Sequence, residues 1–297
     1  MTSPSPSVPP STSTSTSSPD HWDLVIRPHR KWLDLKLGEL WRYRDLVMLF
    51  VRRDFVSFYK QTILGPLWYL IQPLLTTIMF TVVFGNIAKL PTDGLPKFLF
   101  YMAGTTVWTY FAACLTSTSD TFISNAGLFG KVYFPRLAVP VSYLISRLIS
   151  FAIQFVFFLA FMGYFVLHGS HIHPNWWILA TPLLVLMMAG LGLGFGIIIS
   201  ALTTKYRDLR FLVSFGVQLM MYATAVIYPL SATPPRYLPF IRANPMTSVV
   251  EAFRHAFLGG GSVSLGGLAY SVAFMVVIVV IGAVIFNKVE ATFMDTV

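Results

Sequence analysis

The feature that most constrains this chain is a series of apolar stretches, each long enough to cross a membrane as a helix. The hydrocarbon core of a bilayer is about 30 Å thick, and roughly 20 helical residues span it. We therefore predict an all-α membrane protein with six transmembrane helices. The predicted spans are Leu67–Ile87, Phe98–Thr116, Val139–Leu167, Trp176–Leu202, Phe211–Leu230 and Leu268–Phe286.

Composition excludes most other classes of protein. Hydrophobic residues make up 55% of the 297 positions and charged residues 11%, whereas a soluble domain carries about 25% charged residues. The net charge of +9 fits a cytoplasmic excess of Lys and Arg in so apolar a chain, so no nucleic-acid partner is expected. The single cysteine, Cys114, permits neither an intrachain disulfide nor a zinc site built from cysteines.

The charges divide the chain into three parts. Residues 1–21 are rich in Ser, Thr and Pro and are predicted to form a disordered tail. Residues 22–62 form a charged cytoplasmic segment, and residues 63–297 form the membrane domain. Near the spans, nine Lys and Arg fall on the side of the N-terminus and five on the other. This excess predicts that both termini are cytoplasmic.

The spans contain no visible source of energy. Arg147 is the one charged residue well inside a predicted span, and ion-coupled carriers usually bury carboxylates there. Backbone carbonyls can also bind sodium, so an ion-coupled carrier stays an alternative. The phosphate-loop pattern of ATPases is not matched: residues 125–132 lack its first Gly and its hydroxyl. Few acids are paired, which argues against an embedded transferase.

Two further groups of residues have structural interpretations. Gly190, Gly192, Gly194 and Gly196 are interpreted as sites of close helix packing, with a flexible point in the helix as the alternative. His168, His171 and His173 have no carboxylate or Cys nearby. We therefore predict a solvated loop and no metal site.

An amphipathic helix is predicted over Gly38–Lys60. At 100° per residue, an apolar face lies opposite a charged one. This pattern is typical of a helix on the inner membrane surface, or of a helix packed on a partner protein. The apolar face contains Leu40, Tyr43, Val47, Phe50, Val51 and Phe58, and the charged face contains Arg42, Asp45, Arg52, Arg53 and Lys60.

Several motifs follow one another in a characteristic order. They are Glu39–Asp45, Arg53-Asp54, Tyr59–Trp68, Gln72-Pro73, Phe84-Gly85, Lys131–Arg136, Lys205–Asp208, Tyr228-Pro229 and Asn244–Arg254. In order and spacing, the chain resembles the permease subunits of ABC transporters that export polysaccharides such as O-antigen, capsule and teichoic acid. Ser57-Phe58 departs from the pattern, because the family often has a basic residue there.

The resemblance implies the following assembly. Two copies of this permease would form a homodimer in the bacterial cytoplasmic (inner) membrane, with two copies of a cytoplasmic ABC ATPase. ATP and Mg would bind to the ATPase, so this chain would be no enzyme and would hold no cofactor. A lipid-linked polysaccharide would pass between the permeases. A permease for a drug or small lipid is the alternative of the same class.

The resemblance also assigns roles to cytoplasmic and outer residues. Coupling to the ATPase would involve Lys131, Tyr133, Pro135, Arg136, Lys205, Arg207 and Asp208, although such charges can also serve topology alone. Residues 231–262 would form short re-entrant helices at an outer gate. The gate residues are Asn244, Pro245, Glu251 and Arg254. Asn244-Pro245 suits the start of a helix, and Glu251 can pair with Arg254 or His255.

Two sets of residues suit a glycan on a lipid diphosphate. Arg52, Arg53 and Lys60 can bind the diphosphate, although anionic membrane lipids would attract the same cations. Aromatic rings can pack against sugar rings with little hydrogen bonding, but membrane aromatics also serve as anchors and packing. The candidate channel aromatics are Trp68, Tyr69, Tyr101, Trp108, Tyr110 and Phe111.

Overall fold

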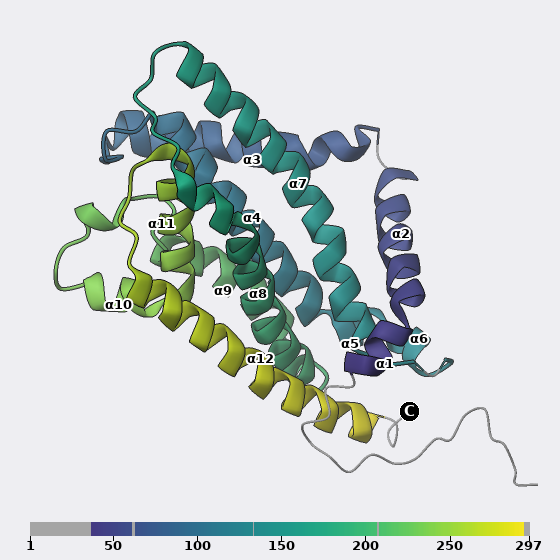
Figure 1. Cartoon of the computed structure of the whole chain (residues 1–297). Coiled ribbons are helices and arrows are strands. Elements are labelled where there is room, and N and C mark those ends of the chain that lie inside the picture. The colour runs from purple at the N-terminus through teal and green to yellow at the C-terminus, as the bar shows by residue number, and fades with distance from the viewer. Residues whose placement is uncertain (1–36, 61–62, 133, 207, 294–297) are drawn as a thin grey trace, which may run out of the picture. The chain divides into compact units, whose positions relative to one another are not determined.

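The computed structural model describes residues 37–60, 63–132, 134–206 and 208–293, which form helices and no strands (Figure 1). The predicted tail over 1–21 lies outside these residues. The longer helices are α2 (Arg44–Lys60), α3 (Trp68–Phe80), α4 (Lys97–Ser119), α7 (Ala138–Leu167), α8 (Thr181–Thr203), α9 (Leu209–Ala223), α11 (Pro245–Leu258) and α12 (Leu265–Phe293). The shorter helices are α1 (Leu37–Arg42), α5 (Thr121–Ser124), α6 (Ala126–Phe129) and α10 (Leu238–Ala243).

Five predicted spans are confirmed as helices long and apolar enough to cross a membrane. They are Trp68–Ile87, Lys97–Ser119, Ala138–Leu167, Trp176–Thr203 and Leu265–Val289. The first continues α3 through a π-helical stretch, Thr81–Ile87, and the fourth begins with a 3-10 turn, Trp176–Ala180. An all-α membrane protein is therefore the correct class.

The span predicted over Phe211–Leu230 differs from the structure. Helix α9 has 15 residues and ends at Ala223, after which Thr224 is extended. Fifteen helical residues rise about 22 Å, which is shorter than the hydrocarbon core. The span is predicted from an apolar run through Leu230, but the last part of that run does not continue α9. The count of six complete transmembrane helices is thus not confirmed.

Helix α4 lies at the centre of the described part of the chain. It packs against α3, α7, α8 and α11, and Figure 1 shows it among them. Leu99, Tyr101 and Phe111 on this helix are fully buried. By contrast, few side chains in the first, third and last spans are buried, so these helices present much of their surface to lipid or to other chains.

The glycines of α8 allow close packing on two sides, as predicted. A Cβ atom on Gly192 or Gly196 would contact Cys114 or Thr118 of α4. A Cβ atom on Gly194 would instead contact the α12 backbone, 3.0 Å from the Ile278 carbonyl carbon. Alternate glycines therefore hold α4 on one side of α8 and α12 on the other.

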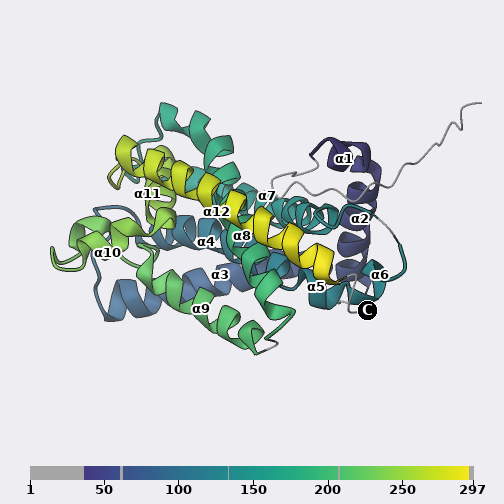
Figure 2. The same cartoon turned by 90° about the horizontal axis from the view of Figure 1, so that it is seen from below.

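The predicted amphipathic segment forms α1 and α2, but its apolar face packs on this chain itself. Val47, Phe50 and Val51 are buried. Val47 and Phe50 belong to a cluster with residues of α7, and Figure 2 shows α2 beside α7. The side chains of Trp41 and Leu49 remain exposed. These exposed side chains suit the membrane interface, whereas the middle of the predicted apolar face is already covered.

We predict that Gly196→Ala destabilises the fold by about 1–3 kcal/mol, because overpacking forces helices apart. The new Cβ would lie 2.7 Å from Thr118 Cγ2 and 3.0 Å from the Leu115 carbonyl oxygen. The measurement is thermal unfolding of the purified chain. Gly163→Ala in α7 is the matched control, because a Cβ there meets no atom within 4 Å. Equal losses in both variants would contradict the packing role of Gly196.

Candidate functional site

The segment between α4 and α7 forms a hairpin that is anchored by aromatic side chains. The Phe134 ring lies 5.7 Å from that of Phe129 and 5.6 Å from that of Phe50 in α2. Phe122 stacks on Phe286 of α12 at 4.7 Å. These contacts link the hairpin to the N-terminal and C-terminal helices, so a force on it would reach both.

The predicted coupling residues divide into exposed and buried groups. Lys131, Lys205 and Asp208 are exposed at this end of the molecule, whereas Pro135 is buried. Arg136 is 3% exposed and its guanidinium lies 5.3 Å from the centre of the Phe129 ring. Arg136 therefore supports the hairpin from within. Tyr133 and Arg207 lie outside the described residues.

An ion pair that the sequence did not reveal joins the ends of two helices. At the start of α9, Arg210 Nη2 lies 3.1 Å from Oδ2 of Asp120, which is the residue directly after α4. The residues are far apart in sequence, so no local spacing indicates the pair. The ion pair connects the hairpin between α4 and α7 to α9. The other carboxylate oxygen, Asp120 Oδ1, is buried and has no hydrogen-bond partner among the described residues.

The three predicted head-group cations differ in their surroundings. Arg52 and Lys60 are exposed on α2. Arg53 donates two hydrogen bonds to Asp54 Oδ1, at 3.0 and 2.9 Å, and lies over the Phe50 ring. Its charge is thus compensated within the chain, which leaves Arg52 and Lys60 better suited to hold an external phosphate.

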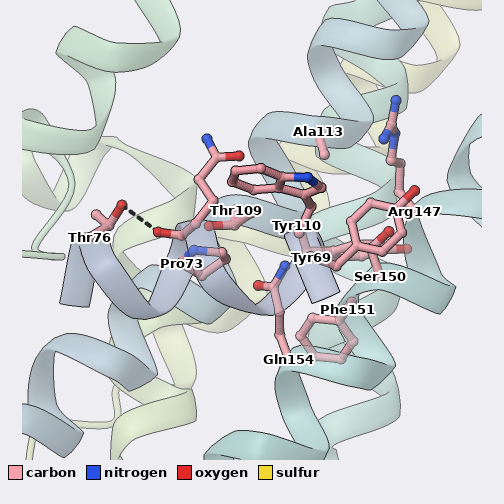
Figure 3. Close-up of a pocket in the computed structure, with 12 residues that line it drawn as sticks. Tyr69, Pro73, Thr76, Thr109, Tyr110, Ala113, Arg147, Ser150, Phe151 and Gln154 are labelled. Atoms are coloured by element: carbon pink, nitrogen blue, oxygen red, sulfur yellow. Dashed lines mark hydrogen bonds between the residues drawn. The ribbon is translucent and has the colours of Figure 1, made fainter. Parts of the chain in front are cut away.

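The six candidate channel aromatics occupy two kinds of environment. Tyr101, Trp108, Tyr110 and Phe111 belong to the main buried cluster, and all but Tyr110 serve as packing alone in this conformation. Trp68, Tyr69 and Tyr110 line a cavity of about 270 Å³ between α3, α4 and α7 (Figure 3). Only this second group reaches a space that a ligand could enter.

The end of the molecule at α10 and α11 contains the short helices predicted for an outer gate. Asn244 begins α11: its Oδ1 accepts a hydrogen bond from the Met246 N–H at 3.0 Å, and its Nδ2 donates to Thr224 Oγ1. Pro245 occupies the first helical position. Ser231 donates to Asp93 Oδ1 at 2.6 Å, which ties the segment after α9 to the loop after the first span.

Arg254 is the most interconnected side chain at this end. It is 1% exposed, donates to the carbonyls of Ala225 and Val226, and lies 3.7 Å over the Phe100 ring. Of the two predicted partners of Glu251, the structure selects Arg254, at 3.3 Å. Arg254 therefore fastens the extended stretch after α9 to α11 and α4.

Burial also affects the acid of this pair. It raises the pKa of the Glu251 carboxyl above its ordinary value, although Arg254 and the Ser262 N–H favour the ionised form. The Ser262 N–H donates to Glu251 Oε2 at 3.2 Å. Gly104 in α4 leaves space for the Arg254 guanidinium, because a Cβ atom at position 104 would lie 2.7 Å from Arg254 Nη2. Gly104 was not identified from the sequence, since its role depends on a distant side chain.

A comparison with known protein families identifies the family of this chain. The profile described as ABC-2 type transporter matches residues 45–258, which run from α2 to the end of α11. The chain belongs to the ABC-2 type transporter family. Members of this family are transmembrane permease subunits of ABC transporters, so the resemblance stated from the motifs is confirmed.

Individual relatives of the ABC-2 chain are named for O-antigen export. It is 28% identical to the O-antigen export system permease protein RfbA of Klebsiella pneumoniae over 253 residues, covering 84% of this chain and 94% of that protein. It is 27% identical to the RfbA protein of Myxococcus xanthus over 222 residues, covering 74% and 82%. The similarity thus extends over nearly the whole length of the Klebsiella protein.

We predict that Arg254→Gln strongly destabilises this permease, by about 3–5 kcal/mol, because it leaves the Glu251 carboxylate buried without its cation. The measurement is the thermal midpoint and folded yield in detergent. Arg242→Gln is the matched control, because Arg242 is exposed in the neighbouring helix α10 and should change stability by less than about 0.5 kcal/mol. A stable Arg254→Gln protein would refute the structural role of Arg254.

Proposed function

We propose that this chain is the permease subunit of an ATP-driven exporter that moves lipid-diphosphate-linked polysaccharide, such as O-antigen, out of the cytoplasm. The observation that carries the proposal is the match to permeases named for O-antigen export, over 94% of the length of the Klebsiella protein. The homodimer and the two ATPase copies are part of the proposal. The proposal also includes an orientation with both termini in the cytoplasm of a bacterium.

The arrangement of the described helices supports an external source of energy. The hairpin between α4 and α7, named the coupling hairpin for its proposed role, presents Lys131 to solvent. It is anchored on α2, α7 and α12 through its aromatic residues. The Asp120–Arg210 pair extends this linkage to α9. An ATPase that binds the hairpin could therefore shift several helices together, because packed helices move as rigid units.

The experiment is reconstitution with and without the ATPase. The permease is co-expressed with its cognate ABC ATPase, purified, and placed in liposomes with a lipid-linked glycan. We expect ATP-dependent appearance of the glycan on the opposite side, and no ATP hydrolysis by the permease alone. Export by the lone chain on an ion gradient would refute the proposal. Export of a small lipid or drug but not of the glycan would refute the proposed cargo.

We predict that Lys131→Glu reduces binding of the ATPase by about 10-fold without changing thermal stability, because an exposed charge at an interface is reversed. The measurement is co-purification yield beside the thermal midpoint. Arg236→Glu is the control, since Arg236 is exposed at the opposite end. Arg136→Gln should instead lower the thermal midpoint, because its side chain is buried over Phe129. Normal ATPase binding by Lys131→Glu would remove the assignment.

A further inference from the structure

A stripe of polar residues runs along α7, inside the third span. Ser142, Ser146, Ser150 and Gln154 follow one another at intervals of four, which places them on one face of the helix. Ser142 donates to the Val139 carbonyl. By contrast, Ser146 Oγ, Ser150 Oγ and Gln154 Oε1 are buried and have no hydrogen-bond partner among the described residues.

These unpartnered atoms lie beside two adjoining cavities. Ser150 and Gln154 line the cavity of about 270 Å³, and Figure 3 shows the Gln154 side chain extending from α7 toward α3. Ser146 lines a second cavity, of about 290 Å³, together with Asp54 of α2. Arg147 lines both cavities, so the polar stripe and the two spaces meet at its side chain.

Arg147 is a cation without a counter-ion in the described part of the chain. Its Nε donates to Ser117 Oγ at 3.0 Å, and no described carboxylate lies in salt-bridge range of it. Asp54, in the second cavity, is already paired with Arg53. A cation within a membrane helix is costly, because it loses contact with water. An anion beside Arg147 would offset part of this cost.

We propose that these adjoining cavities bind the phosphate head group of a lipid from the leaflet on the α2 side. The planar guanidinium of Arg147 suits phosphate oxygens, and Ser146 and Ser150 supply hydroxyl donors. Trp68, Pro73 and Phe151 line the first cavity and provide an apolar surface for the first carbons of the lipid.

The position of the site along α7 fits a head group. Arg147 lies nine residues after the first residue of a 30-residue helix, or about 14 Å from that end. The complete helix is about 45 Å long, which exceeds the hydrocarbon core by about 15 Å. The helix must therefore tilt or protrude. Because α2 packs on this half of α7, Arg147 lies toward the interface rather than the bilayer centre.

The proposal does not depend on the cargo. The same phosphate chemistry is present in a resident anionic phospholipid and in a lipid diphosphate that carries a glycan. Its failure would leave the proposed export function intact, since export also rests on the family and the coupling hairpin. The two sources differ in charge and in the lipid tail, so binding measurements can separate them.

The test measures binding of short-chain lipids to the purified full chain in detergent, by native mass spectrometry and by the shift in thermal midpoint. The lipids are dioctanoyl phosphatidylglycerol, dioctanoyl phosphatidylcholine and geranylgeranyl diphosphate, with inorganic phosphate as the free anion. We expect the anionic lipids to bind at least about 10-fold more tightly than phosphatidylcholine, because charge-assisted hydrogen bonds are the strong ones.

Variants of residues that line the two cavities test whether the lipids bind at this site. Arg147→Gln should weaken binding of the anionic lipids at least about 10-fold, and Arg147→Lys should weaken it less, because the charge remains. Gln154→Leu combined with Ser150→Ala tests the polar stripe with the charge intact, and should also weaken binding. Arg236→Gln is the matched control, since Arg236 is exposed at the outer end, and it should bind as the unmodified chain does.

Each outcome decides the proposal. Tighter binding of phosphatidylglycerol, lost in Arg147→Gln, supports a resident phospholipid as the source. Tighter binding of the diphosphate, lost in the same variant, supports the lipid carrier of a cargo. Equal binding of phosphatidylcholine and phosphatidylglycerol would overturn the proposal if the diphosphate also binds no better. Equal binding by Arg147→Gln and Arg236→Gln, or full protection by inorganic phosphate alone, would overturn it as well.

Discussion

The half of the fold that contains α10 and α11 depends on the hydrogen bonds from Arg254 to the carbonyls of Ala225 and Val226. Once α9 ends at Ala223, the following carbonyls have no helical partner, and a bilayer offers no water to replace it. Arg254 satisfies two of them from α11. Glu251 compensates its charge, and Gly104 leaves the space that the guanidinium fills. The segment after the short helix α9 is thereby stabilised by side chains instead of by its own backbone.

The half that contains the hairpin between α4 and α7 depends on close packing rather than on polar contacts. Alternate glycines of α8 bring α4 and α12 close on opposite sides, and the coupling hairpin rests on this group through Phe122 and Phe286. Dispersion forces act over short distances, so close backbones maximise them where lipid tails compete with apolar side chains. The two halves thus respond differently to substitution: the half with the hairpin is sensitive to side-chain volume, and the half with α10 and α11 is sensitive to charge.

Periodicity and length predicted most of the fold, because membrane-spanning helices satisfy their own hydrogen bonds and their signal is local. Five spans and the cap at Asn244 follow from such local signals. Contacts between distant segments could not be predicted. The early end of α9 depends on Arg254, some 30 residues later. The burial of Arg136 depends on Phe129 and the folded hairpin. Likewise, hydrophobicity marked the apolar face of α2 but did not indicate that α7 covers it.

The two arginines within the apolar body, Arg147 and Arg254, show why partners matter more than burial. Arg254 has a carboxylate, two carbonyls and an aromatic ring around its charge, so the charge is compensated within the chain and its role is structural, although its Nε has no hydrogen-bond partner among the described residues. Arg147 has one hydroxyl, from Ser117, and adjoins cavities with three unpartnered oxygens. Buried polar groups normally have partners. A cation held in an incomplete polar environment next to open space is therefore where an external anion gains most, because each new hydrogen bond replaces none within the protein.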